Sequence, residues 1–174
     1  IYDYYSNNLA NSKGGVYLSG FSTNFKILNN SFYETQANVP TISNSYYGVY
    51  VYSTSNVYHT IQGNYFGGSS PQAGGNPFTV SPAANLTYQM YPIYVNSLAS
   101  TNPNSIQGNV IKNYFLDKGY STTPFMGISV WEGLANIGTI TGNTIGSPTG
   151  SGSIIIKNYY PSSGVSFQGI YLNA

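Results

Sequence analysis

Apolar and polar residues alternate in a short motif that recurs five times along the chain. Each copy is a small residue followed by an apolar, a variable and a second apolar residue. Alternation with period two, rich in Val and Ile, predicts a β-strand whose two apolar side chains face the core while the variable side chain faces the surface. The copies lie at 15–18, 48–51, 92–95, 127–130 and 169–172.

A second motif follows the first four times. It reads apolar, any, Gly or Asn, Asn, any, apolar, and its copies lie at 27–32, 61–66, 106–111 and 140–145. The recurring Asn is a short polar residue that can bond neighbouring backbone at a tight turn. If the repeats stack, we expect these residues to form a ladder: Asn30, Asn64, Asn109 and Asn143.

The spacing of the two motifs indicates a repeat protein. From the small residue of the first motif to the last apolar residue of the second, the separation is always 17 to 19 residues. From there to the next small residue it varies from 14 to 26. A constant half and a variable half are typical of a solenoid, in which each unit covers the apolar face of its neighbour and insertions lie on one side. The longest insertions are 66–92 and 145–169.

These motifs resemble the parallel β-helix repeats of the pectate-lyase-like superfamily, whose coils carry the same apolar-any-Gly-Asn-any-apolar turn followed by a Gly-Ile-any-Leu type strand. The resemblance covers essentially the whole chain. It implies an all-β fold, a right-handed single-stranded parallel β-helix of about five coils, with 1–174 as a single segment. The superfamily includes lyases, hydrolases, epimerases, viral spikes and inert surface proteins, so the fold does not carry a function.

Both ends of the chain fall in the middle of a repeat. Ile1 aligns with the closing apolar position of the second motif, and the chain stops just after the strand at 169–172. A solenoid cut at both ends would expose strand edges and core, which repeat proteins normally cover with caps. We therefore expect a fragment of a longer solenoid, or a piece stabilised by neighbouring subunits.

The chain carries very little charge. Five Lys and four acidic residues give a net charge of +1, and there is no Arg. Scattered Lys residues form no basic patch, so a nucleic-acid partner is not expected. No apolar run approaches the roughly 20 residues needed to cross a bilayer, so no membrane insertion is expected in this segment.

With no Cys and one histidine, His59, neither a metal cluster nor a catalytic triad can be assembled, so no cofactor is expected. We expect His59 at the surface.

Tyr, Asn, Ser and Thr take the place of charge. This composition resembles that of extracellular proteins of acid-loving or hot-spring archaea, and it implies an extracellular or cell-surface location. A surface with few carboxylates changes little in charge at low pH. Two sequons, beginning at Asn29 and Asn85, permit N-glycosylation.

The variable position of the first motif predicts a column of aromatic side chains on the outer face. It is Tyr in four copies and Ser129 in the fourth along the chain, and stacked strands would bring these residues about 4.8 Å apart. Exposed aromatics suit a protein contact or a sugar-binding platform. Alternatively, Tyr simply suits a strand surface and stacks for stability. The candidate binding residues are Tyr17, Tyr50, Tyr52, Tyr94, Trp131 and Tyr171.

One pair of carboxylates is a candidate for catalysis. Asp3 and Glu34 each fall two residues after a closing apolar position, so consecutive coils could bring their carboxyls within roughly 5 Å, as in retaining glycosidases. Such a pair would repel unless one member were protonated, and both could instead be solvated loop residues. Glu132, next to Trp131, could serve a sugar site. The acidic calcium ligands and basic Arg or Lys of uronate-cleaving superfamily members match no position here.

The sequence favours an extracellular structural or adhesive β-helix segment of a cell-surface, filament or appendage assembly. Its outer aromatics and inserted loops would contact glycans or other subunits. A carbohydrate-active enzyme of the glycoside hydrolase or lyase type, and a segment of a viral fibre or spike, remain alternatives.

Overall fold

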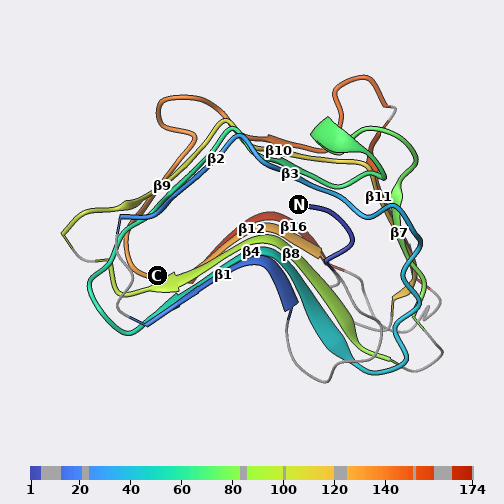
Figure 1. The fold of residues 1–174 in the computed structure, drawn as a ribbon, viewed down its shortest axis with the longest axis horizontal. Helices are drawn as coiled ribbons and strands as arrows, with labels where there is room; N and C mark the ends of the chain where they lie inside the picture. Colours follow the sequence, from blue (N-terminus) through green and yellow to red (C-terminus); the bar gives the residue numbers. More distant parts are fainter. Residues whose placement is uncertain are drawn as a thin grey trace.

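The protein is all-β in the part that the computed structural model describes, which comprises residues 1–4, 13–20, 24–82, 86–99, 101–119, 125–150, 152–158 and 166–173. Its strands form four parallel sheets (Figure 1). One short 3-10 helix, η1 (Pro71–Ala73), interrupts them. No helix among the described residues is long and apolar enough to cross a membrane.

The largest sheet contains all five copies of the first motif. Its strands follow the order β1-β4-β8-β12-β16, and they are β1 (Lys13–Ser19), β4 (Asn44–Ser53), β8 (Tyr88–Ser97), β12 (Phe125–Glu132) and β16 (Phe167–Leu172). The motif positions pair in register, so that Val49 lies opposite Val16 on one side and Ile93 on the other. The predicted strands and their parallel stacking are confirmed.

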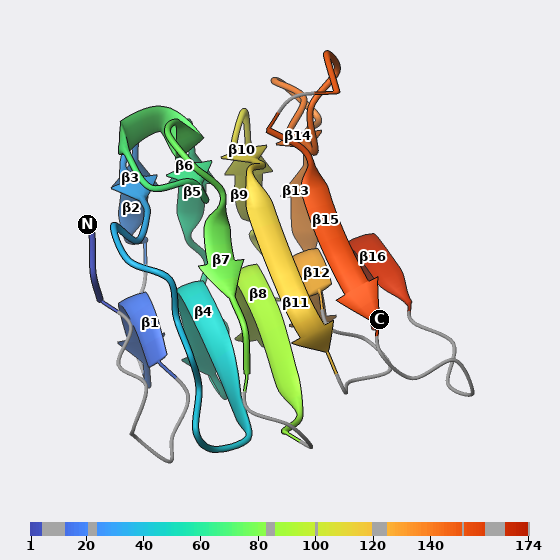
Figure 2. The ribbon, with the colours of Figure 1, turned by 90° about the vertical axis from the view of Figure 1, so that its right-hand side faces the viewer.

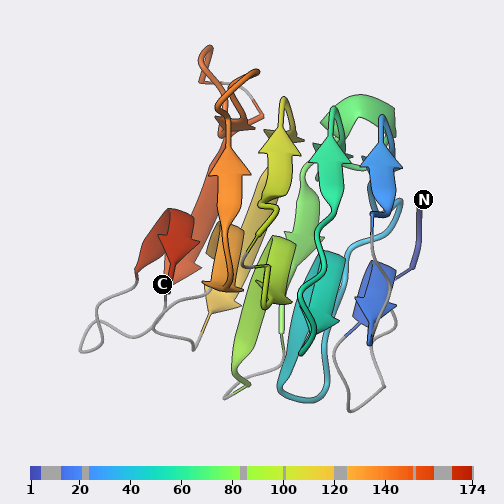
Figure 3. The same ribbon diagram turned by 90° about the vertical axis from the view of Figure 1, so that its left-hand side faces the viewer.

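The second motif contributes to two four-stranded sheets, one on each side of its Asn. The first holds β2 (Lys26–Leu28), β5 (Thr60–Gln62), β9 (Asn104–Gln107) and β13 (Ala135–Ile137). The second holds β3 (Ser31–Phe32), β6 (Tyr65–Phe66), β10 (Val110–Ile111) and β14 (Thr144–Ile145). A three-stranded sheet, with β7 (Phe78–Val80), β11 (Tyr114–Gly119) and β15 (Ile154–Asn158), lies in the variable half. Figures 2 and 3 show successive repeats side by side.

The predicted asparagine ladder is present between the two four-stranded sheets. The backbone N–H of Asn30 donates to Asn64 Oδ1 over 2.9 Å, and that of Asn64 donates to Asn109 Oδ1 over 3.0 Å. The N–H of Asn109 donates in turn to Asn143 Oδ1 over 2.9 Å. Each side-chain amide thus satisfies backbone groups that would otherwise be unpaired where the chain turns.

The fourth copy of the second motif differs from the prediction. Ile137, not Ile140, pairs with Ile106, and Ile140 is 87% exposed. The intervening residues 138–142 loop outward, and Gln107 holds them because its Oε1 accepts the N–H of Ile140 over 3.1 Å and its Nε2 donates to the carbonyl of Asn136 over 2.8 Å. The spacing was misleading because the insertion contains Ile140, which precedes Asn143 by three residues, just as Ile106 precedes Asn109.

In the first two repeats, the core leaves no room for a side chain at the small residue of the first motif. A Cβ atom on Gly48 would lie 2.7 Å from the ring of Phe66, and one on Gly15 would lie equally close to Phe32. These two rings stack on each other at 4.6 Å with an angle of 4° between their planes. The closing apolar residue of the second motif therefore packs directly against the small residue of the first, across the interior.

The five-stranded sheet bends toward the interior near this small residue (Figure 1). Strict alternation slips by one residue there: Gly48 and Val49 both face the core, whereas Tyr47 and Tyr50 both face outward and pack together. The outer face of the sheet lies on the inside of the bend. Side chains on either side of the bend are therefore brought toward each other on that face.

His59 is buried rather than at the surface, contrary to the prediction. Its Nδ1 accepts the backbone N–H of Phe25 over 3.3 Å, and the backbone N–H of His59 donates to Asn104 Oδ1 over 3.0 Å. Burial lowers the pKa of His59 below its usual 6.5. Protonation at Nδ1 would break its bond with Phe25, so this bond also favours the neutral imidazole.

We expect stability to fall when the pH drops below about 6.5. Because the pKa of His59 is lowered in the folded state, the unfolded chain binds the proton more readily. The contribution of His59 to the free energy of unfolding is therefore present above the pKa of the unfolded chain. It is lost as the pH falls toward the pKa of the folded chain. Urea midpoints measured between pH 7.5 and 5.5 check this. The variant His59→Asn, whose Oδ1 can accept from Phe25, should flatten the profile, and an equally steep profile in the variant would exclude His59 as the cause.

Candidate contact surface on the outer face of the five-stranded sheet

A column of parallel tyrosine rings runs across the first three strands of the five-stranded sheet. Tyr17 and Tyr50 stack with their ring centroids 4.9 Å apart and their planes 5° apart, and Tyr50 and Tyr94 stack at 5.0 Å and 2°. The three residues are direct neighbours in the strand register. Stacking at this spacing follows from the strand separation, and it covers both flat faces of the middle ring, Tyr50.

The column is interrupted at Ser129, the position in register between Tyr94 and Tyr171. Ser129 was expected at the surface, but it is fully buried. Trp131 lies across this gap, with ring centroids 6.3 Å from Tyr94 and 5.0 Å from Tyr171. An aromatic network therefore continues over all five strands, and the small Ser side chain is covered instead of exposed.

All six aromatic residues predicted as binding candidates belong to this network. The last of them, Tyr52, lies beside Tyr50 with a centroid distance of 6.4 Å. Tyr17 is 58% exposed and Tyr52 is 42% exposed, while the others are half-buried. The members of the set, hereafter the aromatic face, are Tyr17, Tyr50, Tyr52, Tyr94, Trp131 and Tyr171.

A second row of side chains, which the sequence pattern missed, underlies the aromatic face. Tyr47 and Tyr91 stack at 5.0 Å, and Met126 completes the row. Tyr47 meets Tyr50 edge to face at 4.7 Å, and Tyr91 meets Tyr94 edge to face at 5.5 Å. These three side chains are largely buried although they lie outside the main core. The bend therefore creates a second, smaller apolar cluster on the outer side of the sheet.

The pKa values of three tyrosine hydroxyls in this region are raised. Burial, reinforced by neighbouring tyrosines, raises the pKa of Tyr50 and of Tyr91 to about 12. Burial also raises the pKa of Tyr94, with a smaller opposing effect of its hydrogen bond to Asn96. Neutral phenols can both donate and accept hydrogen bonds. The Glu132 carboxylate lies close enough to Tyr94 to contribute to the raised pKa, so one acidic group borders the surface.

The structure places the two candidate catalytic carboxylates in different surroundings. Their backbones are adjacent, as predicted, because Tyr2 bridges to Tyr33. Asp3 has a positive φ of 48° and is exposed, and its two oxygens accept the N–H and the hydroxyl of Thr35 over 2.7 and 2.6 Å. Glu34 is only 4% exposed. It lies near Tyr114, whose pKa is raised by burial and, to a smaller extent, by Glu34. A catalytic role for the pair remains a prediction.

The structure describes the first of the two sequons, which begins at Asn29. Asn29 is exposed and adopts a positive φ of 55°, at a turn position where the next repeat has Gly63. A side chain at the surface is a requirement for glycosylation, which stays a prediction. Asn85 lies outside the described residues.

The inserted loop after β6 is organised by Asn113. Its Nδ2 lies 3.1 to 3.4 Å from four consecutive backbone carbonyls, those of residues 73–76. Its own carbonyl accepts the N–H groups of Gly68 and Phe78. One largely buried side chain thus fixes the shape of this loop, which was expected to contribute to contacts.

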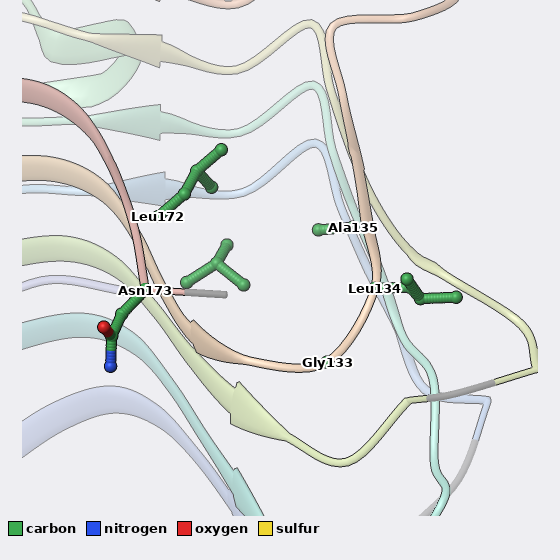
Figure 4. A pocket seen from close by; sticks show the side chains of 6 residues that line it. Gly133, Leu134, Ala135, Leu172 and Asn173 are labelled. Carbon is green, nitrogen blue, oxygen red and sulfur yellow. The ribbon is translucent and has the colours of Figure 1, made fainter.

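An apolar pocket of about 210 Å³ lies beside the last strand (Figure 4). Leu172 of β16 and Ala135 of β13 point toward one another across it, and Val130, Gly133, Leu134 and Asn173 complete its lining. It contains no acid or base. Among the described residues, no group of three or more His, Cys, Asp or Glu side chains could hold a metal ion.

Comparisons with protein-family models, with curated proteins and with solved structures give no match for this chain.

Proposed function

We propose that the chain is a segment of a right-handed parallel β-helix of the pectate-lyase-like type, and that it serves as a structural or adhesive element of a cell-surface or filament assembly. The support for the helix is that each repeat places equivalent strands in several parallel sheets. Connections between parallel strands are right-handed in nearly all known cases. The low charge and the abundance of Tyr, Asn and Ser favour an extracellular location.

The observation that carries the proposal is the continuity of the aromatic face. Rings from all five strands of one sheet touch in sequence, from Tyr17 on β1 to Tyr171 on β16. Contiguous exposed apolar surface bordered by polar groups is characteristic of interaction sites. Tyr and Trp are also the residues that dominate binding energy at protein contacts. The aromatic face is therefore the contact surface of this segment, for glycans or for neighbouring subunits.

Two measurements on the purified chain test this function: sedimentation velocity for self-association, and retention on a panel of insoluble polysaccharides. We expect at least one of them to be positive. The double variant Tyr17→Ser/Tyr52→Ser should weaken that interaction about tenfold, because two exposed rings lose their contact area. The control Tyr2→Ser removes a ring that is also exposed but lies outside the face. Absence of both interactions, or equal losses in both variants, would overturn the proposal.

A further inference from the structure

The intact part of the tyrosine column offers a ligand few ring faces. The planes of Tyr17, Tyr50 and Tyr94 are within 5° of parallel at 4.9 to 5.0 Å, so the middle ring, Tyr50, has a neighbour on both faces. Only the edge and the hydroxyl of this middle ring remain accessible. A sugar ring packs its C–H groups against the face of an aromatic ring, so the inner column is a poor platform for it.

The break in the column at Ser129 is different. Trp131 is tilted by 35° from Tyr94 and by 50° from Tyr171, so it stacks on neither ring. Its position comes from a shift in strand register: Val130 pairs with Val95, whereas Glu132 pairs with Asn96, which leaves Trp131 as the additional residue. Such bulges re-aim side chains and occur preferentially beside functional sites.

Polar residues adjoin the bulge at Trp131. Glu132 is exposed and pairs with Asn96, which bonds the hydroxyl of Tyr94. Asn173 is exposed too, and its backbone N–H donates to the carbonyl of Val130 over 2.9 Å, which holds it beside the bulge. The indole N–H of Trp131 is buried and finds no acceptor in the described part of the chain. A buried donor without a partner costs free energy, and no hydrogen bond holds the indole in this position.

We infer that this break is a carbohydrate subsite, in which Trp131 packs against one sugar ring of a neutral polysaccharide while Glu132 and Asn173 bond its hydroxyls. The inference rests on the proposed function and names the ligand of the same face. A neutral sugar fits because it presents an apolar C–H face together with hydroxyls that both donate and accept. A charged ligand would find a single carboxylate and no cation among the residues named.

The test uses the fact that Trp131 is the only tryptophan. Neutral hexasaccharides of glucose, mannose and xylose are titrated into the chain while its tryptophan emission is recorded. We expect a saturable change with at least one of them. Glu132→Gln and Asn173→Ala should each weaken binding, by about tenfold for the charged partner, because a hydrogen bond to a carboxylate is lost. Tyr2→Ser, which removes an exposed ring outside the aromatic face, should change the affinity less than twofold.

Calorimetry of Trp131→Ala, which lacks the reporter, should show binding reduced more than tenfold, with an unchanged melting temperature as evidence of folding. If no hexasaccharide alters the emission while the chain still self-associates through the aromatic face, the subsite is wrong and the contact function stands. A sugar could also bind in such a way that Tyr17→Ser abolishes the binding and Asn173→Ala does not. The ligand would then lie elsewhere on the aromatic face, which also overturns the subsite. If neither sugars nor other copies bind, the proposed function fails as well.

Discussion

Replacing Gly67 by alanine is expected to destabilise the fold by at least about 4 kcal/mol, near the upper end for single substitutions. Gly67 is buried, has a φ of +109° and follows the closing apolar residue Phe66. A Cβ atom there would overlap the backbone carbonyl oxygen of Lys112 in the next repeat. The added strain of a side chain at this φ costs about 1–3 kcal/mol more. Because backbone cannot move aside like a flexible side chain, neighbouring repeats would have to separate.

Gly146 provides a matched control for this substitution. It occupies the same position after Ile145 and also has a positive φ, +89°, but nothing lies within 4 Å of its added Cβ. Gly146→Ala should therefore show only the backbone strain. Urea unfolding followed by circular dichroism compares the two variants. Equal losses would mean that the close approach of Gly67 to Lys112 does not limit the packing of the repeats.

Asn64→Ala is expected to cost roughly 3–5 kcal/mol, because it removes the fully buried centre of the ladder. Asn64 Oδ1 accepts the backbone N–H of Asn30 over 2.9 Å, and its Nδ2 donates to the carbonyl of Ile27 over 2.8 Å and to Asn109 Oδ1 over 3.0 Å. Alanine removes the partners of the Asn30 N–H and the Ile27 carbonyl, whereas Asn109 Oδ1 keeps its bond with the backbone N–H of residue 64. Each such group costs about 1–3 kcal/mol.

The control for the ladder is Asn30→Ala, at its more exposed end. Asn30 donates through Nδ2 to the carbonyl of Leu28 and to Asn64 Oδ1, and that oxygen keeps its bond with the backbone N–H of Asn30 after the substitution. The loss should stay near 1 kcal/mol. Thermal melts of both variants check the difference. A milder effect at Asn64 than at Asn30 would contradict the assigned role of the buried amide.

Much of the fold could be predicted from local pattern, because strand register in this chain follows the motif. The number of residues between the motifs was enough to predict the pairing of Val16 with Val49 and the order of the Asn ladder. The position of Ile140 could not be found in this way, because an insertion reproduced the motif spacing by coincidence. His59 was misplaced because its buried hydrogen bonds come from two other repeats.

The candidate surface was predicted only on one side of the bend. Strict alternation places Tyr46 outward and Tyr47 inward, whereas the structure has Tyr46 in the core and Tyr47 in the outer cluster. The reversal arises because Gly48 must pack against Phe66 across the interior, a contact that the strand sequence itself does not contain. Two Tyr residues directly before the small residue, at 47 and 91, were the available signal. The same limitation concealed the bulge that positions Trp131.

The asparagine ladder has a consequence for how the stack folds. Every link runs the same way, with the N–H of one repeat donating to the side-chain carbonyl of the next. The amide dipoles therefore align head to tail, and each bond polarises the next one, so that the series is stronger than its separate members. A repeat that detaches would weaken the dipoles of those that remain. The ladder thus couples the repeats into one cooperative unit, although each of them contacts only its immediate neighbours.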